Sequence, residues 1–246
     1  MQFIFKASAY LLVLLLAGLW LKPQAAFQQS PLQKSPWNIE QGETDALTQN
    51  VNLRQHENGQ YNFTGNLLLS NISPKMLHWF YKNQIQQTLL FNSQTMPWFR
   101  LTNPNTMVNL AIVSSADKLS NEIGYGTVFD EQTLLKDTQW QTRYKVRSFG
   151  DEGMTLDILH AGYTVGSIEY KYRKNKLGTE VNISGTIGIN MPIVGQISNF
   201  YLFKKVYPSD LLDDWISNIV SSYKHMELLI PALYDQRHKS SYLINS

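Results

Sequence analysis

Hydrophobic and polar residues alternate with a period of two through much of the middle of the chain. Four stretches show this pattern, with the following residues at alternate positions: Tyr61, Phe63, Leu67, Leu69; Trp140, Thr142, Tyr144, Val146; Ile168, Tyr170, Tyr172; and Val181, Ile183, Ile187, Ile189. Successive side chains of a β-strand point to opposite faces of the sheet. We therefore predict an antiparallel sheet with one face against the core and the other in water. Hairpin turns are expected at Asp151-Glu152-Gly153 and between Lys174 and Gly178.

Two helices are predicted on either side of this sheet. Ser73 and Pro74 form a typical helix start, and that helix is expected to run to about Leu90. A second helix is expected to be capped by Ser209 and to end before Pro231. Its first turn carries Asp210, Asp213 and Asp214, and its apolar stripe is Leu211, Leu212, Trp215, Ile216, Ile219, Val220 and Tyr223.

A long C-terminal helix after an antiparallel meander predicts a sheet that curves around the helix. We therefore expect an α+β domain of the helix-grip (START-like) type, preceded by an N-terminal hydrophobic helix. This arrangement usually leaves a cavity between the helix and the sheet, where a small molecule can bind.

The first 27 residues are expected to be a membrane anchor or a signal peptide. An apolar run from Ala7 to Leu21 follows Lys6, whereas a spanning helix needs about 20 residues. Cleavage after Ala25 or Ala26 would place Pro23 or Gln24 at position −3, where a small residue is needed, so we favour the anchor. Either segment places the domain at or across a membrane, in the cell envelope or periplasm. Residues 28–48 are expected to be a linker, 49–238 the domain, and 239–246 a tail.

The amino-acid composition argues against several classes of function. The net charge of +2 and the scattered Lys and Arg residues argue against a nucleic-acid partner. The absence of cysteine excludes disulfides, thiolate zinc sites and a cysteine nucleophile. Aromatic residues make up 12% of the chain, and such side chains can either fill a core or line a cavity.

No catalytic motif is visible in the residues themselves. The histidines, His56, His78, His160, His225 and His238, show none of the spacings typical of zinc sites, and Gly162 to Ser167 reads GYTVGS rather than GxSxG. His160 shares its parity with apolar neighbours, and His225 lies on the apolar face of the predicted C-terminal helix. We interpret each as a buried, hydrogen-bonded histidine in preference to a general base.

The C-terminal half carries more specific motifs: GSIEY at Gly166–Tyr170, GTEV at Gly178–Val181, Ile187-Gly188 with PIVG at Pro192–Gly195, Asn199, Trp215, and IPALY at Ile230–Tyr234. With these residues the chain resembles the 2,4-diacetylphloroglucinol hydrolase family, which includes phloretin hydrolase. The match extends from about Ile72 to Tyr234. The resemblance implies a helix-grip fold and a zinc ion that helps hydrolyse a carbon–carbon bond beside a ring carbonyl.

The family holds its zinc with two His and two Glu, and this chain departs from that pattern. Met107 stands at one ligand position and Asn103 at the preceding His, while Asn218 and Ser222 stand at the two helix positions. Only an acid matches, Glu131 or its neighbour Asp130. Because amide and hydroxyl groups are poor zinc ligands, we expect no metal and no cofactor.

The resulting hypothesis is a metal-free relative that binds a small apolar or aromatic molecule in the cavity. Its expected lining residues are Trp79, Phe80, Trp98, Met107, Glu131, His160, Trp215, Asn218 and Ser222. No catalytic residue is assigned, and whether the protein is an enzyme stays open. One alternative is an active hydrolase that cleaves a carbon–carbon bond in acylphloroglucinol-like ketones, with a rearranged metal site or with His160 or His225 as base. Another is an envelope scaffold or interaction module, favoured if no internal void above a few hundred Å³ exists.

Overall fold

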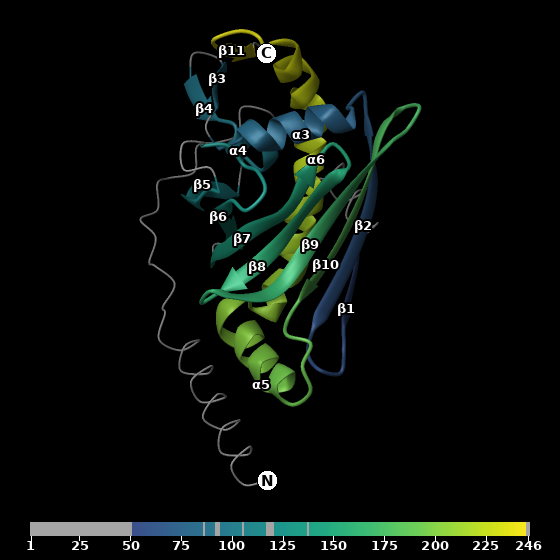
Figure 1. Ribbon diagram of the computed structural model, residues 1–246, viewed down its shortest axis with the longest axis vertical. Helices are drawn as coiled ribbons and strands as arrows, with labels where there is room; N and C mark the ends of the chain where they lie inside the picture. The colour runs from purple at the N-terminus through teal and green to yellow at the C-terminus, as the bar shows by residue number, and fades with distance from the viewer. Residues whose placement is uncertain are drawn as a thin grey trace.

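A strongly curved sheet of eight antiparallel strands forms the body of the domain (Figure 1). The strands follow the order β1-β2-β10-β9-β8-β7-β6-β5. Their bounds are β1 Val51–Gln55, β2 Tyr61–Ser70, β5 Met107–Ser114, β6 Val128–Leu135, β7 Thr138–Gly150, β8 Gly153–His160, β9 Tyr163–Lys174 and β10 Gly178–Ile187. The two predicted hairpin turns join β7 to β8 and β9 to β10.

The structure is a computed structural model that describes residues 51–244 except 86, 92–93, 105, 117–120 and 137. The expected N-terminal segment and linker lie outside the described residues. Within the described part of the chain, no helix combines the length and the apolar character needed to span a bilayer.

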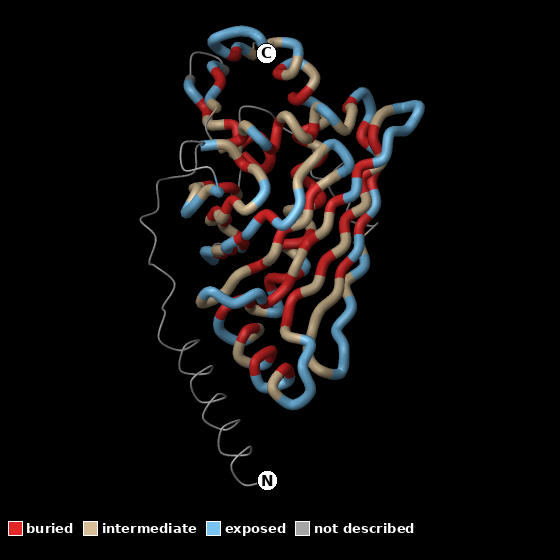
Figure 2. The backbone as a smooth tube through the Cα atoms, in the orientation of Figure 1, coloured by how far each residue is buried: buried red, intermediate tan, exposed pale blue. Residues whose placement is uncertain are grey.

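The alternation predicted from the sequence is confirmed along the strands. On β7 the inward residues Trp140, Thr142, Tyr144 and Val146 are all buried, and the residues between them are more exposed. Figure 2 shows the same alternation of buried and exposed positions across the sheet. The pleat of each strand places its apolar side chains on the concave face, where they form the core.

Helix α6, Leu212–Asp235, lies across the concave face and completes the helix-grip fold, so the predicted fold class is confirmed. A 3₁₀ turn at Ser209–Leu211 precedes it, and no side chain caps its start. The prediction that the helix ends before Pro231 is wrong. Proline removes only one donor, and Ile230 and Leu233, both fully buried, hold the last turn against the core.

Helix α3, Pro74–Asn83, begins as predicted, with Ser73 Oγ accepting a hydrogen bond from the Met76 amide at 3.3 Å. It does not reach Leu90. Instead Thr88–Phe91 forms β3, which pairs with β4, Gln94–Pro97. The Trp98 amide donates to the Gln87 carbonyl at 2.9 Å. These main-chain bonds outside the helix replace those that a longer helix would have made.

Several elements were not predicted. Besides the strands β1, β5 and β6, they include α4, Phe99–Thr102; α5, Val194–Tyr201, which continues into a π-helix at Leu202–Val206; and β11, Tyr242–Ile244. β11 pairs in parallel with β3 at one end of the domain. The domain therefore extends beyond residue 238, into the segment expected to be a tail.

Candidate functional site

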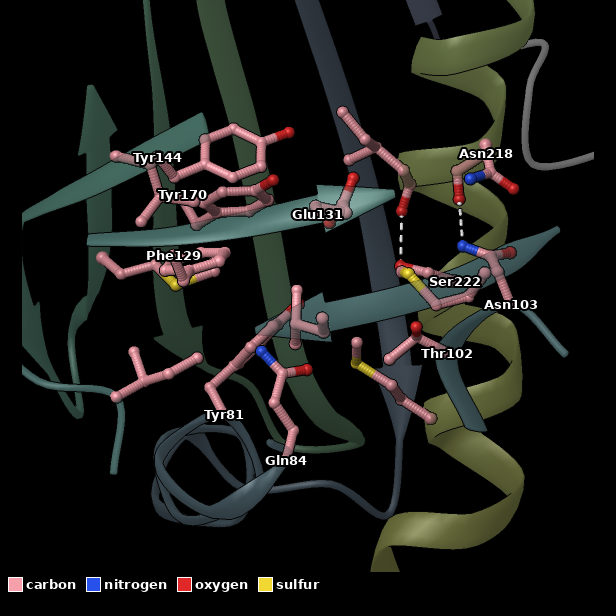
Figure 3. A pocket seen from close by; sticks show the side chains of 17 residues that line it. Tyr81, Gln84, Thr102, Asn103, Phe129, Glu131, Tyr144, Tyr170, Asn218 and Ser222 are labelled. Carbon is pink, nitrogen blue, oxygen red and sulfur yellow. Dashed lines mark hydrogen bonds between the residues drawn. The ribbon is translucent and has the colours of Figure 1, made fainter. Parts of the chain in front are cut away.

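A cavity of about 60 Å³ lies between the middle of α6 and the strands β5 to β9. Its lining joins apolar and polar side chains (Figure 3): Tyr81, Gln84, Thr102, Asn103, Met107, Leu110, Ile123, Phe129, Glu131, Tyr144, Met154, Leu156, Tyr170, Asn218, Ile219, Ser222 and Met226. The volume holds a few water molecules or one small chemical group. It lies below the ~300–1,000 Å³ usual for drug-sized ligands.

Glu131 is the acidic residue of the cavity, and Asp130 is not part of it. Glu131 shares its face of β6 with Phe129, which is buried against the core. Asp130 points to the opposite face, where both of its oxygens accept hydrogen bonds from Arg143 at 2.7 Å. Because neighbouring side chains of a strand point to opposite faces, Glu131 can contact a ligand in the cavity and Asp130 cannot.

The environment of Glu131 favours its neutral form. Burial raises the pKa of Glu131 to about 7, because a carboxylate loses its hydration in the protein interior. A hydrogen bond from the Tyr144 side chain lowers the pKa and offsets only part of this effect. Near neutral pH the group can therefore donate a hydrogen bond as the acid or accept one as the carboxylate.

Three tyrosines line the same cavity: Tyr81 from α3, Tyr144 from β7 and Tyr170 from β9. Burial raises the pKa of each well above its ordinary value, so the hydroxyls stay protonated and can donate. In Figure 3, Glu131 is seen between Tyr144 and Tyr170 on one side and the α6 residues on the other.

The α6 side of the cavity is built by a polar network. Asn103 Nδ2 donates to the main-chain carbonyl of Asn218 at 2.9 Å, and Thr106 Oγ1 donates to Asn218 Oδ1 at 2.8 Å. The Ser222 hydroxyl turns back along its own helix and donates to the Ile219 carbonyl at 2.6 Å. These bonds fix the segment after α4 against the middle of α6.

Met107, Met154 and Met226 line the apolar part of the cavity. Methionine side chains are unbranched and can change rotamer at low cost. The three side chains can therefore enlarge the cavity without a change in the backbone.

The four positions that the resemblance assigns to zinc ligands come together in this cavity. Met107 starts β5, Glu131 lies on β6, and Asn218 and Ser222 are one turn apart on α6. Their donors are a thioether, a carboxylate, an amide and a hydroxyl, which do not fit the nitrogen, carboxylate and thiolate donors of zinc sites. Among the described residues, no group of three or more His, Asp or Glu side chains is placed to hold a metal ion.

Three of the expected lining residues belong instead to an aromatic cluster at the β3–β4–β11 end. The Trp79 and Trp98 ring centroids are 5.0 Å apart, Phe80 stacks on Trp98 at 5.7 Å, and Tyr242 of β11 meets Trp98 at 4.7 Å. None of Trp79, Phe80 and Trp98 lines the cavity.

Trp215 also lies outside the cavity. Its ring stacks on Trp140 at 5.6 Å and meets the edge of Phe63 at 5.8 Å. The side chain is almost fully buried, so this residue fills the core between α6 and the sheet.

Neither of the two candidate bases reaches the cavity. His225 is buried, and its Nδ1 donates to the Ser221 carbonyl at 3.2 Å. His160, which ends β8, is only partly buried, and its buried Nε2 has no hydrogen-bond partner. The prediction of a buried, hydrogen-bonded histidine is therefore confirmed for His225 and wrong for His160. Burial lowers the pKa of both histidines, which keeps them neutral near pH 7.

Sequence reasoning missed the three tyrosines, Gln84 and Thr102 of the cavity. Tyr144 and Tyr170 were placed correctly on the inward face, and a hydroxyl on an apolar face was the available signal. Gln84 follows α3 and Thr102 is the last residue of α4, and no local pattern connects either residue to β6.

Similarity to known proteins is confined to solved structures. No protein-family model matches the chain, and no curated protein matches it. Ara h 8.0201 is 13% identical, with a TM-score of 0.45 over 70% of this chain and 98% of its own. The major latex-like protein 151 of Panax ginseng is 10% identical, with a TM-score of 0.41 over 67% and 96%. A protein of unknown function from Staphylococcus aureus is 13% identical, with a TM-score of 0.42 over 72% and 97%.

Proposed function

We propose that the domain is a metal-free relative of the 2,4-diacetylphloroglucinol hydrolase family that binds a small apolar or aromatic molecule in the cavity. The main support is the convergence of Met107, Glu131, Asn218 and Ser222 on one cavity. These positions were matched to the family from the sequence alone, at separations of up to about 115 residues. The four positions lie together in the fold, which is consistent with a binding site at the same place as in the family but with different side chains.

The cavity lining favours a ligand over a plain core. The cavity holds the carboxyl group of Glu131 together with amide and hydroxyl groups, where a plain core would place apolar side chains. Asn103, Asn218 and Ser222 already have hydrogen-bond partners within the protein. A molecule with one or two hydrogen-bonding oxygens would therefore bond chiefly to Glu131, while Phe129, Leu110 and the methionines would contact its apolar part.

The cavity volume of about 60 Å³ is below a few hundred Å³, so the void criterion by itself favours the scaffold alternative, and the proposal rests on the lining residues. The small volume also limits the ligand. A single substituted ring fits only if Met107, Met154 or Met226 changes rotamer. Neutral Glu131 would donate to a carbonyl oxygen of such a ligand, and charged Glu131 would accept from a phenolic hydroxyl. The proposed ligand is therefore compact, planar and oxygenated on one edge.

Methionine-methyl NMR with 2-acetylphloroglucinol as the probe tests this proposal on the full chain. Resonances of Met107, Met154 and Met226 are expected to shift on titration. Met191, which is exposed on the surface, is the internal control and should not shift. If all methionine resonances shift equally, or if none of them shifts, the scaffold alternative is favoured. Stoichiometric zinc found by elemental analysis would overturn the metal-free proposal.

A cavity-filling variant adds a second test. Ser222→Leu places an apolar side chain in the cavity and should weaken binding of the probe by at least about tenfold, because ligand and side chain compete for one space. Ser148→Leu on the outer face of β7 is the matched control, since Ser148 is exposed. Equal binding by both variants would place the ligand elsewhere.

A second candidate function is hydrolysis of the acyl group from such a ring without a metal. It is favoured by the position of Glu131, an acid that titrates near pH 7 beside the Tyr144 hydroxyl. Water would add to the carbonyl carbon of the acyl group, and the bond between this carbon and the ring would break. The ring carbon would take up the proton that the water gives up, so the products are a carboxylic acid and the ring with hydrogen in place of the acyl group. Chromatography of the probe after incubation separates the two functions: release of phloroglucinol and acetate, resistant to chelator and abolished in Glu131→Gln, would identify the hydrolase.

A further inference from the structure

One side of α5 exposes a continuous set of apolar side chains. Ile193, Ile197 and Phe200 are 75%, 45% and 69% exposed, and Met191 just before them is 53% exposed. Ile197 and Phe200 are three residues apart in α5, so they lie on the same side of the helix, and Ile193 is the residue directly before its first turn. We call these four residues the α5 face.

The opposite side of α5 is held by polar contacts to the rest of the domain. Asn199 is fully buried, its Oδ1 accepts from the Ile189 amide at 2.6 Å, and its Nδ2 donates to the Asn58 carbonyl at 2.9 Å. Gly195 and Ser198 are buried on the same side. The helix is therefore fixed in an orientation that turns its apolar side away from the core.

This orientation reverses the usual rule for a surface helix, whose apolar stripe faces the core. Exposed apolar groups that are clustered and fixed in position mark contact with a partner or a membrane. The α5 face also lies beside an open groove of about 610 Å³ that includes Tyr61, Phe200 and Lys204 in its lining.

The charges that follow α5 distinguish between possible partners. Lys204 and Lys205 are exposed directly after the helix, and Lys204 Nζ lies 5.4 Å from the centre of the Phe200 ring. Exposed acids in the adjoining segments are Glu57, in the same groove, and Asp210 and Asp213 around the start of α6. The two lysines directly follow the α5 face, whereas Asp210 and Asp213 come further along the chain. Apolar side chains bordered by lysines match the boundary between acyl chains and anionic headgroups.

We propose that the α5 face docks on a lipid bilayer that contains anionic headgroups. Ile193, Ile197 and Phe200 enter the boundary between headgroups and acyl chains, and Lys204 and Lys205 lie among the headgroups. The chain outside the described residues permits this position. The apolar run that ends at Leu21 is separated from Val51 by about 30 residues, which can span up to roughly 100 Å. The proposal does not depend on the function of the cavity.

The lack of cysteine in the chain allows a direct test on the full-length protein. Ile197→Cys carries an environment-sensitive fluorophore on the α5 face. Leu177→Cys, in the exposed turn between β9 and β10 at the other end of the sheet, carries the same fluorophore as the matched control. Each protein is reconstituted in vesicles of phosphatidylcholine and phosphatidylglycerol, with and without nitroxides on the acyl chains.

Docking predicts a blue-shifted emission at position 197 and quenching about threefold or more stronger than at position 177. Lys204→Glu with Lys205→Glu should weaken this quenching in vesicles that contain phosphatidylglycerol, and added salt should weaken the quenching of the protein with both lysines unchanged. Equal, weak quenching at both positions would overturn the proposal. A blue shift at position 197 without quenching would also overturn it, because a protein segment or a second copy would then cover the face.

Discussion

Asn103 donates a hydrogen bond of 2.9 Å to the main-chain carbonyl of Asn218, which connects the end of α4 to the middle of α6. Asn103 is almost fully buried, and both residues line the cavity. The bond therefore holds together two walls of the candidate site that come from segments more than 100 residues apart.

Asn103→Ala is expected to lower the free energy of unfolding by about 1–3 kcal/mol, because a buried hydrogen bond is lost and its acceptor is less well satisfied. Urea denaturation measures this loss. Asn52→Ala on the exposed side of β1 is the control and should change stability by less than about 0.5 kcal/mol. Equal, small effects of both variants would show that the bond does not hold the walls together.

Glu131 makes stability depend on pH. Its pKa in the folded protein is raised to about 7 from an ordinary 4.5, so the folded state binds a proton that the unfolded state releases. Its stabilising contribution is complete below pH 4.5 and is lost as pH rises through 7. The free energy of unfolding should fall by up to roughly 3 kcal/mol over this window.

Glu131→Gln should remove this dependence, because the amide is neutral at every pH. Urea midpoints of both proteins at pH 5 and pH 8 measure the effect. Glu152→Gln in the exposed turn between β7 and β8 controls for the loss of one acid. A Glu131→Gln variant with the pH slope of the unchanged protein would contradict the assignment.

Tyr242 connects the C-terminal strand to the aromatic cluster, where its ring lies 4.7 Å from that of Trp98. Tyr242→Ala should cost about 2–4 kcal/mol and shift tryptophan emission to the red, because Trp98 loses its cover. Thermal unfolding followed by fluorescence measures both effects. Tyr163→Ala, at a half-exposed tyrosine, should leave the emission unchanged.

Gly185 lies opposite Phe63 in the pairing of β10 with β2, and a Cβ at this position would overlap the Phe63 ring. Gly185→Ala should destabilise the domain by about 1–3 kcal/mol through overpacking. Phe63→Leu shortens the opposing side chain and should recover part of that loss in the double variant. Additive losses in a double-mutant cycle would show that the two residues do not interact.

The sheet could be predicted from the sequence because alternation is a local property of each strand. Residues such as Tyr144 and Ile168 reveal their inward face within a few positions. The residues at which the helices end were harder to predict from the sequence. Thr88–Phe91 leaves the predicted helix because it pairs with β4 and with β11, and β11 lies more than 150 residues later in the chain.

The candidate site was predicted in part. The predictions that were confirmed are those made by matching positions to the family, and not those made from residue type. Met107, Glu131, Asn218 and Ser222 line the cavity. The tryptophans and Phe80 were assigned to it by type, but aromatic rings fill cores as readily as they line cavities. Helix α5 was missed because pattern analysis assumes that apolar residues face inward, and on this helix they face outward.

The pairing of β2 with β10 has a consequence for how the protein is made. β2 is synthesised early, yet its partners on β10 follow more than 100 residues later, so the sheet cannot close until most of the chain has left the ribosome. During that interval the nascent chain presents the unpaired edge of β2 and the apolar side chains intended for the concave face. Chaperones that shield strand edges should therefore raise the yield of folded protein far more than they alter its final stability.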